Sequence, residues 1–199
     1  MSRSDYILGY GSLLSAYSRQ TYSNMHGDAV PVTAKGWVRG WTATYPDENA
    51  TYLGVRPDPS SSMRAALMPT VIDPALRLRE RGYDFVELEQ SSLTPDQPDI
   101  SLPDGRYWIV VNRDPAPAPA ACPLPQTYVD TCLIGCLEMG GEDLARHFIE
   151  NTEHWTTAWL NDRDHAEKRY PRHSPLDGST RDLIDQLLDN AGHLHLRQG

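Results

Sequence analysis

The sequence lacks the features that would tie the chain to a membrane or to a disulfide-stabilised secreted fold. No apolar run approaches the roughly 20 residues needed to span a bilayer. Three cysteines in 199 residues are few and odd in number, which does not suit a disulfide framework. The amino terminus has no small-residue cleavage pattern of the kind found in secretory signals. We therefore expect a cytoplasmic protein with no membrane partner.

Two further absences argue against metal and nucleic-acid chemistry. Cys132 and Cys136 lie four residues apart in a helical pattern, but no second pair accompanies them to complete a metal site. Both are expected to be small, buried side chains. The net charge is −9, and lysine and arginine form no run, which disfavours nucleic acid and anionic membranes. We expect no metal and no cofactor, and the sequence leaves the oligomeric state open.

The composition that remains is that of one folded domain covering residues 1–199. The hydrophobic share of 39% is enough for a core, and the length suits a single domain. Many short strand-like runs separated by turn signals predict an α+β fold whose sheet is closed or strongly curved. The expected strands are 6–8, 30–32, 35–45, 52–55, 65–71, 83–88 and 107–111.

Helices are expected where start and stop signals frame an apolar stripe. Asp73 as N-cap and Pro74 at the first helical position begin one helix. Gly82, in the position that ends many helices, terminates it. Apolar residues at i, i+3 and i+4 predict the other helices: 127–139, 142–150, a continuation through Trp155 and Trp159, and a last helix capped by Ser179.

The composition of four other segments predicts loops or loose ends. Residues 58–62 are expected to form a loop. Residues 114–125 contain five prolines and are expected to be an extended linker or lid. Residues 161–172 are highly charged and are expected to be solvated. His193 and His195 follow a glycine near the C-terminus and suggest a frayed end.

The most informative stretch is residues 6–14, where an uncharged β run enters a turn bracketed by glycines. Gly9 and Gly11 allow close approach by a ligand, and such a turn can direct successive N–H groups into a concavity that suits a carboxylate or phosphate. A dinucleotide fingerprint would need a third glycine where Leu14 stands. A nucleophile elbow would need glycines two residues either side of Ser12. Ser12 is therefore expected to be a binding or turn residue.

Residues 9–13, Gly-Tyr-Gly-Ser-Leu, resemble the strand-to-loop signature of the gamma-glutamylcyclotransferase superfamily, including its ChaC-like branch. Two further landmarks stand in the family's order. Glu80 lies at a helix end, in a Glu-Arg-Gly-Tyr pattern that leads into a strand, and is similar to the family's catalytic glutamate. Tyr128 stands seven residues before Gly135, similar to a tyrosine at the start of the family's later helix. The resemblance covers about residues 6–139.

Without the resemblance, these residues have plainer interpretations. On charge pattern alone, Glu80 is a surface glutamate paired with its flanking arginines. Tyr128 packs a helix against the sheet. Glu87 and Glu89 are competing acids in the strand that follows, although neither matches the family's signature.

The resemblance implies an α+β fold with a small, mixed, mostly antiparallel, barrel-like sheet wrapped by helices, with a helical C-terminal extension from about residue 140. It implies conversion of a γ-glutamyl small molecule to 5-oxoproline and a free amine by intramolecular attack of the α-amine, without metal or cofactor. Glu80 would be the general acid and base. The implied substrate-binding residues are Tyr10, Gly11, Ser12, Leu13 and Tyr128.

Three alternatives stay open at this point. The enzyme could act on a γ-glutamylamine or a secondary metabolite. The chain could instead be a non-catalytic small-molecule-binding protein on the same fold, although an intact Glu80 favours an enzyme. Finally, the segment after residue 139 could be the working surface of an interaction protein, which predicts stable partners and no pocket chemistry.

Overall fold

The computed structural model describes residues 4–199, except for the side chains of residues 75 and 79. The strands of the main sheet are β1 (Asp5–Gly9), β2 (Val30–Tyr45), β3 (Ala50–Thr70), β4 (Tyr83–Leu88), β5 (Leu93–Pro95), β6 (Arg106–Asn112) and β8 (Thr152–Glu153). Their order is β4-β6-β1-β3-β2-β5, with β8 pairing β2. Neighbours are antiparallel except for the β1–β6 and β2–β8 pairs. The α+β class and the mostly antiparallel sheet are confirmed.

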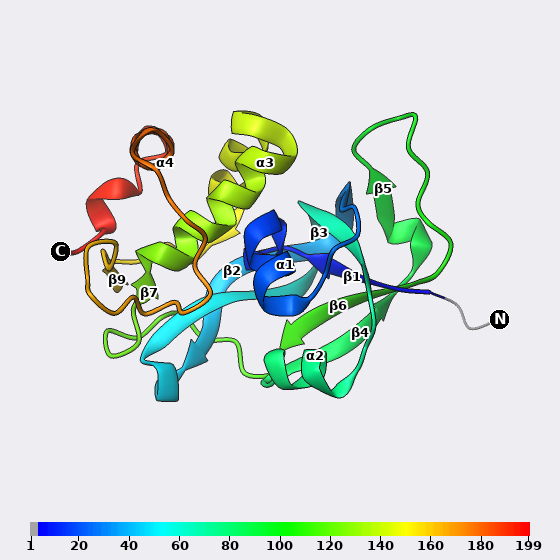
Figure 1. Ribbon diagram of the computed structural model, residues 1–199, viewed down its shortest axis with the longest axis horizontal. Helices are drawn as coiled ribbons and strands as arrows, with labels where there is room; N and C mark the ends of the chain where they lie inside the picture. The colour runs from blue at the N-terminus through cyan, green and yellow to red at the C-terminus, as the bar shows by residue number, and fades with distance from the viewer. Residues whose placement is uncertain (1–3) are drawn as a thin grey trace.

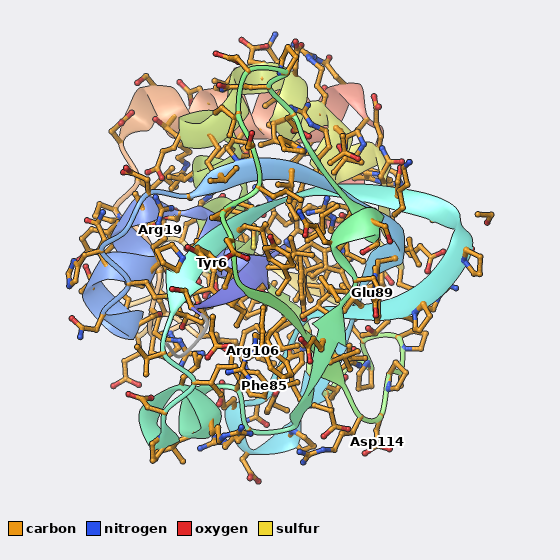
Figure 2. The ribbon with its side chains drawn as sticks, turned by 90° about the vertical axis from the view of Figure 1, so that its right-hand side faces the viewer. Tyr6, Arg19, Phe85, Glu89, Arg106 and Asp114 are labelled. Carbon is orange, nitrogen blue, oxygen red and sulfur yellow. The ribbon has the colours of Figure 1, made fainter. Side chains whose placement is uncertain are left out.

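Strands β2 and β3 form one long antiparallel hairpin, in place of the separate short strands that the sequence predicted. The pairing runs from Tyr45 opposite Ala50 to Val30 opposite Leu67. Asn49, in the left-handed conformation with φ of 47°, ends the 3-10 turn that joins the strands. Figure 2 shows the sheet bending around an interior filled with side chains, which is the curvature expected of a barrel-like sheet.

The loop predicted at residues 58–62 lies inside β3, so that prediction is wrong. Its composition nevertheless marks an irregularity. The register jumps from Lys35 opposite Ser62 to Trp37 opposite Pro57, which leaves residues 58–61 without partners in β2. Such bulges bend a strand and increase its twist, so this segment contributes to the curvature of the sheet.

Helix α2 (Pro74–Arg79) begins where the sequence predicted. The side chain of Asp73 accepts a hydrogen bond of 2.8 Å from the Leu76 amide, which is the usual N-cap interaction. The helix is shorter than expected, because Glu80 is already its C-cap residue. Gly82 follows with φ of 91° and turns the chain into β4.

Helix α3 (Gln126–Glu150) contains both of the helices predicted at 127–139 and 142–150, separated by a kink at Gly140 and Gly141. Cys132 and Cys136 are free and fully buried on it. Burial raises the pKa of the Cys136 thiol to about 12, so it is a poor nucleophile. The interpretation of these cysteines as buried side chains is confirmed.

Helix α1 (Ala16–Ser23) was not predicted from the sequence. Its residues are mostly polar and carry no apolar stripe, so periodicity could not reveal it. Ser15 caps it by accepting a hydrogen bond from the Ser18 amide. The Arg19 guanidinium ties it to the preceding turn through a 2.8 Å bond to the Leu14 carbonyl.

Helix α4 (Gly178–Asn190) forms as expected but starts two residues earlier. Its N-cap is Asp177, whose carboxylate accepts from the Thr180 amide at 2.8 Å. Ser179, the predicted cap, instead donates its hydroxyl proton to the same carboxylate.

In Figure 1, α3 and α4 lie on one side of the sheet, and α2 lies on the other. Within residues 4–199, none of the helices has the length and apolarity to cross a membrane.

The segment that directly follows α3 is not helical, contrary to the prediction for Trp155 and Trp159. Here β8 joins the main sheet, and β9 (Trp159–Leu160) pairs in parallel with β7 (Leu124–Pro125). The two indoles do meet, with ring centroids 5.1 Å apart, but through a folded loop. Strand pairing with distant segments has overridden a spacing that fits a helix.

Residues 161–172 are also more buried than their charge predicted. Asp162 is fully buried and accepts from the amide and hydroxyl of Thr127 at 2.9 and 2.7 Å, so it caps the start of α3. Arg163 forms a buried ion pair of 2.7 Å with Asp130. The charges of Asp162 and Arg163 thus satisfy groups of α3, whereas Asp164, Glu167 and Arg169 are exposed as predicted.

The C-terminal residues are held in place and are not frayed. The Gln198 amide donates to the Trp159 carbonyl at 2.7 Å, and the Asn161 amide donates to the Gln198 carbonyl at 2.8 Å. The His193 ring stacks on Trp155 with centroids 4.9 Å apart. The tail thus covers the β9 region.

Candidate active site

The glycine-bracketed loop leaves β1 at Gly9 and enters a 3-10 helix at Ser12–Leu14. Tyr10 is buried, and its hydroxyl donates to the Val110 carbonyl of β6 at 2.7 Å. The Tyr10 carbonyl accepts from the buried Arg39 guanidinium at 3.0 Å. These contacts hold the loop in place against strands β6 and β2.

The same loop presents backbone amides. The first N–H groups of a helix have no acceptor within that helix. Ser12 and Leu13 begin the 3-10 helix, so their amides are available to a ligand. Gly11 lies against Tyr128: a Cβ at residue 11 would be 2.8 Å from the Tyr128 hydroxyl oxygen. Glycine is needed here for close approach.

Glu80 is positioned by the end of α2. Its amide donates to the Leu76 carbonyl at 2.9 Å, and its carbonyl accepts from the Tyr83 amide at 3.1 Å. The turn that follows needs glycine, because Gly82 has positive φ and a Cβ there would be 2.9 Å from the Tyr45 hydroxyl. Tyr45 in turn donates to the Arg81 carbonyl at 2.8 Å. The Glu-Arg-Gly-Tyr pattern thus sets the place of the Glu80 side chain.

All six residues predicted for the site line two adjoining cavities. The smaller cavity, about 50 Å³, is lined among others by the loop residues 10–13, by Glu80 and by Tyr128. The larger, about 390 Å³, shares Ser12, Glu80 and Tyr128 with it. Three parts of the chain that are distant in sequence therefore meet at one place.

The competing acids do not share this position. Glu87 and Glu89 are exposed and line neither of the two cavities. Glu80, in contrast, is half-buried and lines both cavities. Its chemical role is a prediction that rests on this placement.

Five tyrosines contribute to the wall of the larger cavity. The Tyr128 ring lies 4.8 Å from that of Tyr52 and 4.7 Å from that of Tyr170, in edge-to-face arrangements. Tyr45 and Tyr83 extend the cluster toward Glu80. Such pairs add stability beyond their buried area, and their hydroxyl groups give the cavity a polar lining.

Burial and the nearby acid keep these hydroxyl groups protonated. Burial raises the pKa of Tyr10, and the charge of Glu80 raises it further. Burial and Glu80 also raise the pKa of Tyr45. At neutral pH both are hydrogen-bond donors close to the Glu80 carboxyl group.

Several residues of the cavity were not identified from the sequence. They are Tyr45, Glu48, Tyr52, Arg81, Tyr170 and Arg172. The sequence offered one signal for them, its composition of ten tyrosines and two phenylalanines. This excess of tyrosine indicates that the hydroxyl groups of the aromatic side chains have a function. Their positions carry no common spacing, because the fold brings them from the β2–β3 hairpin, from the turn between α2 and β4, and from the segment before α4.

A solved structure described as a gamma-glutamyl cyclotransferase has a similar fold. The two superpose with a TM-score of 0.55 at 11% sequence identity, over 92% of this chain and 99% of the other. The chain therefore has the gamma-glutamyl cyclotransferase fold, which confirms what the Gly-Tyr-Gly-Ser-Leu stretch implied about the architecture.

Other similarities are weaker. A yeast gamma-glutamyl cyclotransferase specific to glutathione gives a TM-score of 0.38 at 13% identity, over 94% of this chain and 99% of that one. The Arabidopsis thaliana protein At3g28950.1 gives 0.42 at 17% identity, and the match spans 56% of this chain and 64% of that protein's length. No protein-family model matches the sequence, and no curated protein does.

Proposed function

We propose that the chain is a γ-glutamyl cyclotransferase, which converts a γ-glutamyl compound to 5-oxoproline and a free amine. One observation carries the proposal: Glu80 lines the same cavity as the Ser12 loop and Tyr128. The fold shared with a structure described as a gamma-glutamyl cyclotransferase supports it.

The reaction is intramolecular. The α-amine of the substrate attacks its own γ-carbonyl carbon, a C–N bond closes the five-membered ring, and the bond to the leaving amine breaks. No water is consumed. Holding the glutamyl chain folded, with the two reacting atoms close together, supplies a large part of the rate acceleration. A cavity closed by tyrosine rings is suited to that task.

Glu80 supplies the proton transfers. The α-ammonium group must lose a proton before it can attack, and the leaving amine must gain one before it departs. A single carboxyl group within reach of both nitrogens can take the first proton and return it to the second. The position of Glu80, half-buried and lining the same cavities as Ser12 and Tyr128, supports this role.

The loop and Tyr128 hold the substrate in this proposal. The α-carboxylate binds the amides of Ser12 and Leu13, where aligned N–H groups favour an anion. Tyr128 closes the opposite side, with its hydroxyl oxygen against Gly11. This orientation directs the γ-carbonyl toward the Glu80 side of the cavity.

The test is release of 5-oxoproline from glutathione, γ-glutamyl amino acids and γ-glutamyl amines by wild type and Glu80→Gln. Glu87→Gln is the control, because it removes an equivalent carboxylate from an exposed position of β4. We expect Glu80→Gln to lose about 100-fold or more of the activity with unchanged thermal stability, and Glu87→Gln to match wild type. Folded wild type that releases no 5-oxoproline from any of these compounds would overturn the proposal and favour a binding protein.

A further inference from the structure

Arg39, on β2, carries a positive charge in the protein interior with no acid beside it. Its side chain is fully buried. Burial lowers its pKa to about 10, so the guanidinium is still charged at neutral pH. Among the residues that the structure describes, no carboxylate lies within 4.0 Å of it in an ion pair. In a chain of net charge −9, this is unexpected, because buried charges are normally paired.

The guanidinium group of Arg39 lies where three parts of the chain meet. Its Nη1 donates to the Tyr10 carbonyl at 3.0 Å, and its Nη2 donates to the Arg64 carbonyl of β3 at 2.7 Å. The ring centroid of Phe148, on α3, lies 4.5 Å from the guanidinium carbon. The remaining nitrogen, Nε, is buried and has no hydrogen-bond partner. A neutral donor would satisfy the same two carbonyl groups with a smaller desolvation penalty, so the charge itself points to a function.

The contact between Arg39 and the Tyr10 carbonyl sets the direction of the next amide in the loop. In a planar trans peptide the C=O and N–H groups point in opposite directions, so the Gly11 amide points away from Arg39. The amides of Gly11, Ser12 and Leu13 donate to no backbone carbonyl in the described part of the chain. All three residues line the smaller cavity. Gly11 thus adds a third amide to those of Ser12 and Leu13, and successive N–H groups of this kind suit an anion.

We propose that Arg39 is a positioning residue for the carboxylate that binds this loop: it orients the Tyr10–Gly11 peptide and places a positive charge behind the loop amides. This deepens the proposed function and rests on it for the identity of the anion, the α-carboxylate of a γ-glutamyl compound. Arg39 does not touch that carboxylate. It acts across one peptide group, in an interior where charges interact more strongly than in water. The bound carboxylate is then the counter-charge that Arg39 lacks within the protein.

Arg19 has a similar contact at the other end of the same loop but a different charge environment. It is buried, it donates to the Leu14 carbonyl at 2.8 Å, and its Nε also has no partner. Burial lowers the pKa of Arg19, but the charges of Glu138 and Asp28 raise it. No acid acts in this way on Arg39. Arg19 is therefore a matched control, because it holds the loop while its own charge is offset by acids.

The test is calorimetric binding to Glu80→Gln of γ-glutamylglycine and of its analogue with a carboxamide in place of the α-carboxylate. We expect the acid to bind about 10- to 100-fold more tightly than the amide. Adding Arg39→Gln should lower this ratio about tenfold, and Arg39→Lys, which keeps the charge, should restore part of it. Adding Arg19→Gln should leave the ratio unchanged. The ratio compares two ligands on one variant, so a general loss of stability does not alter it. An unchanged ratio in Arg39→Gln would overturn the inference.

The NMR signals of the loop amides test the peptide orientation without any change to Arg39, should Arg39→Gln fail to fold. In isotope-labelled Glu80→Gln, the acid should shift the amide signals of Gly11, Ser12 and Leu13, and the carboxamide analogue should shift them less. Shifts at Ser12 and Leu13 with none at Gly11 would contradict the orientation that Arg39 imposes.

The same binding data, set beside 5-oxoproline release by wild type, separate this inference from the proposed function. Preference for the acid that depends on Arg39, without turnover in wild type, would support the positioning role and refute the cyclotransferase. Turnover in wild type, with a binding ratio that does not depend on Arg39, would refute the positioning role and leave the cyclotransferase standing. Failure of the acid to bind at all would refute both.

Discussion

The Tyr128 hydroxyl oxygen lies so close to Gly11 that a Cβ at residue 11 would be 2.8 Å from it. Tyr128 cannot easily move away, because its ring packs against Trp41, Tyr52 and Tyr170. This contact joins the loop after β1 to the first turn of α3. It therefore links two of the three sequence landmarks of the candidate site directly.

We expect Gly11→Ala to cost about 1–3 kcal/mol of stability, the usual effect of overpacking a filled site, and to lower turnover by displacing the loop. Thermal unfolding and 5-oxoproline release measure the two effects. Gly178→Ala is the control, since a Cβ there meets no atom within 4 Å. The double variant Gly11→Ala with Tyr128→Phe should regain stability without regaining activity. Equal stability of Gly11→Ala and wild type would contradict the close contact.

The second prediction concerns the buried ion pair between Arg163 and Asp130, whose side chains are each 3% exposed. Arg163→Met leaves the Asp130 carboxylate buried without its partner, which typically costs about 3–5 kcal/mol. The segment it holds contains Tyr170 and Arg172, so substrate binding should weaken as well. Chemical denaturation and KM for γ-glutamylglycine test this. A change in stability below about 1 kcal/mol would show that the segment is held by other contacts.

The third prediction concerns pH and His147, which is half-buried in the last turn of α3. Burial, followed by the charges of Arg39 and Arg64, lowers its pKa, while Asp96 and Glu150 oppose this. The unfolded chain, with a pKa of about 6.5, therefore takes up the proton first as the pH falls. Neutral His147 therefore contributes its full stabilisation above about pH 6.5. The contribution decreases as the pH falls from that value to the lower pKa of His147 in the folded chain.

Melting temperatures of wild type and His147→Gln between about pH 5 and pH 8 test this. Relative to the variant, wild type should lose stability as the pH drops below about 6.5. Parallel curves would show that His147 titrates alike in the folded and unfolded chain.

Much of the fold was predictable where the signal is local. Asp73, Pro74 and Gly82 gave the start of α2 and the turn after it, and β4 has the bounds that were expected. The kink at Gly140 in α3 also follows from the local sequence. In each case, the local structure follows from the conformational preference of the residue itself.

The rest depends on contacts between distant segments. The charged residues 161–172 suggested exposure, yet Asp162 and Arg163 are buried, because groups of α3 complement their charge. Tyr170 and Arg172 could not be assigned to the site, since their place in the cavity depends on that same docking. Motifs located Glu80 and the loop, while the far wall of the larger cavity emerged only from the three-dimensional structure.

The identity of the product tests the central claim most directly. Wild type would be incubated with γ-glutamylglycine, and 5-oxoproline, glutamate and glycine would be quantified by NMR or mass spectrometry. Intramolecular attack assisted by Glu80 predicts equal amounts of 5-oxoproline and glycine, no glutamate, and loss of both products in Glu80→Gln. Release of glutamate would mean that water attacks the γ-carbonyl, and undiminished 5-oxoproline formation by Glu80→Gln would contradict the role of Glu80.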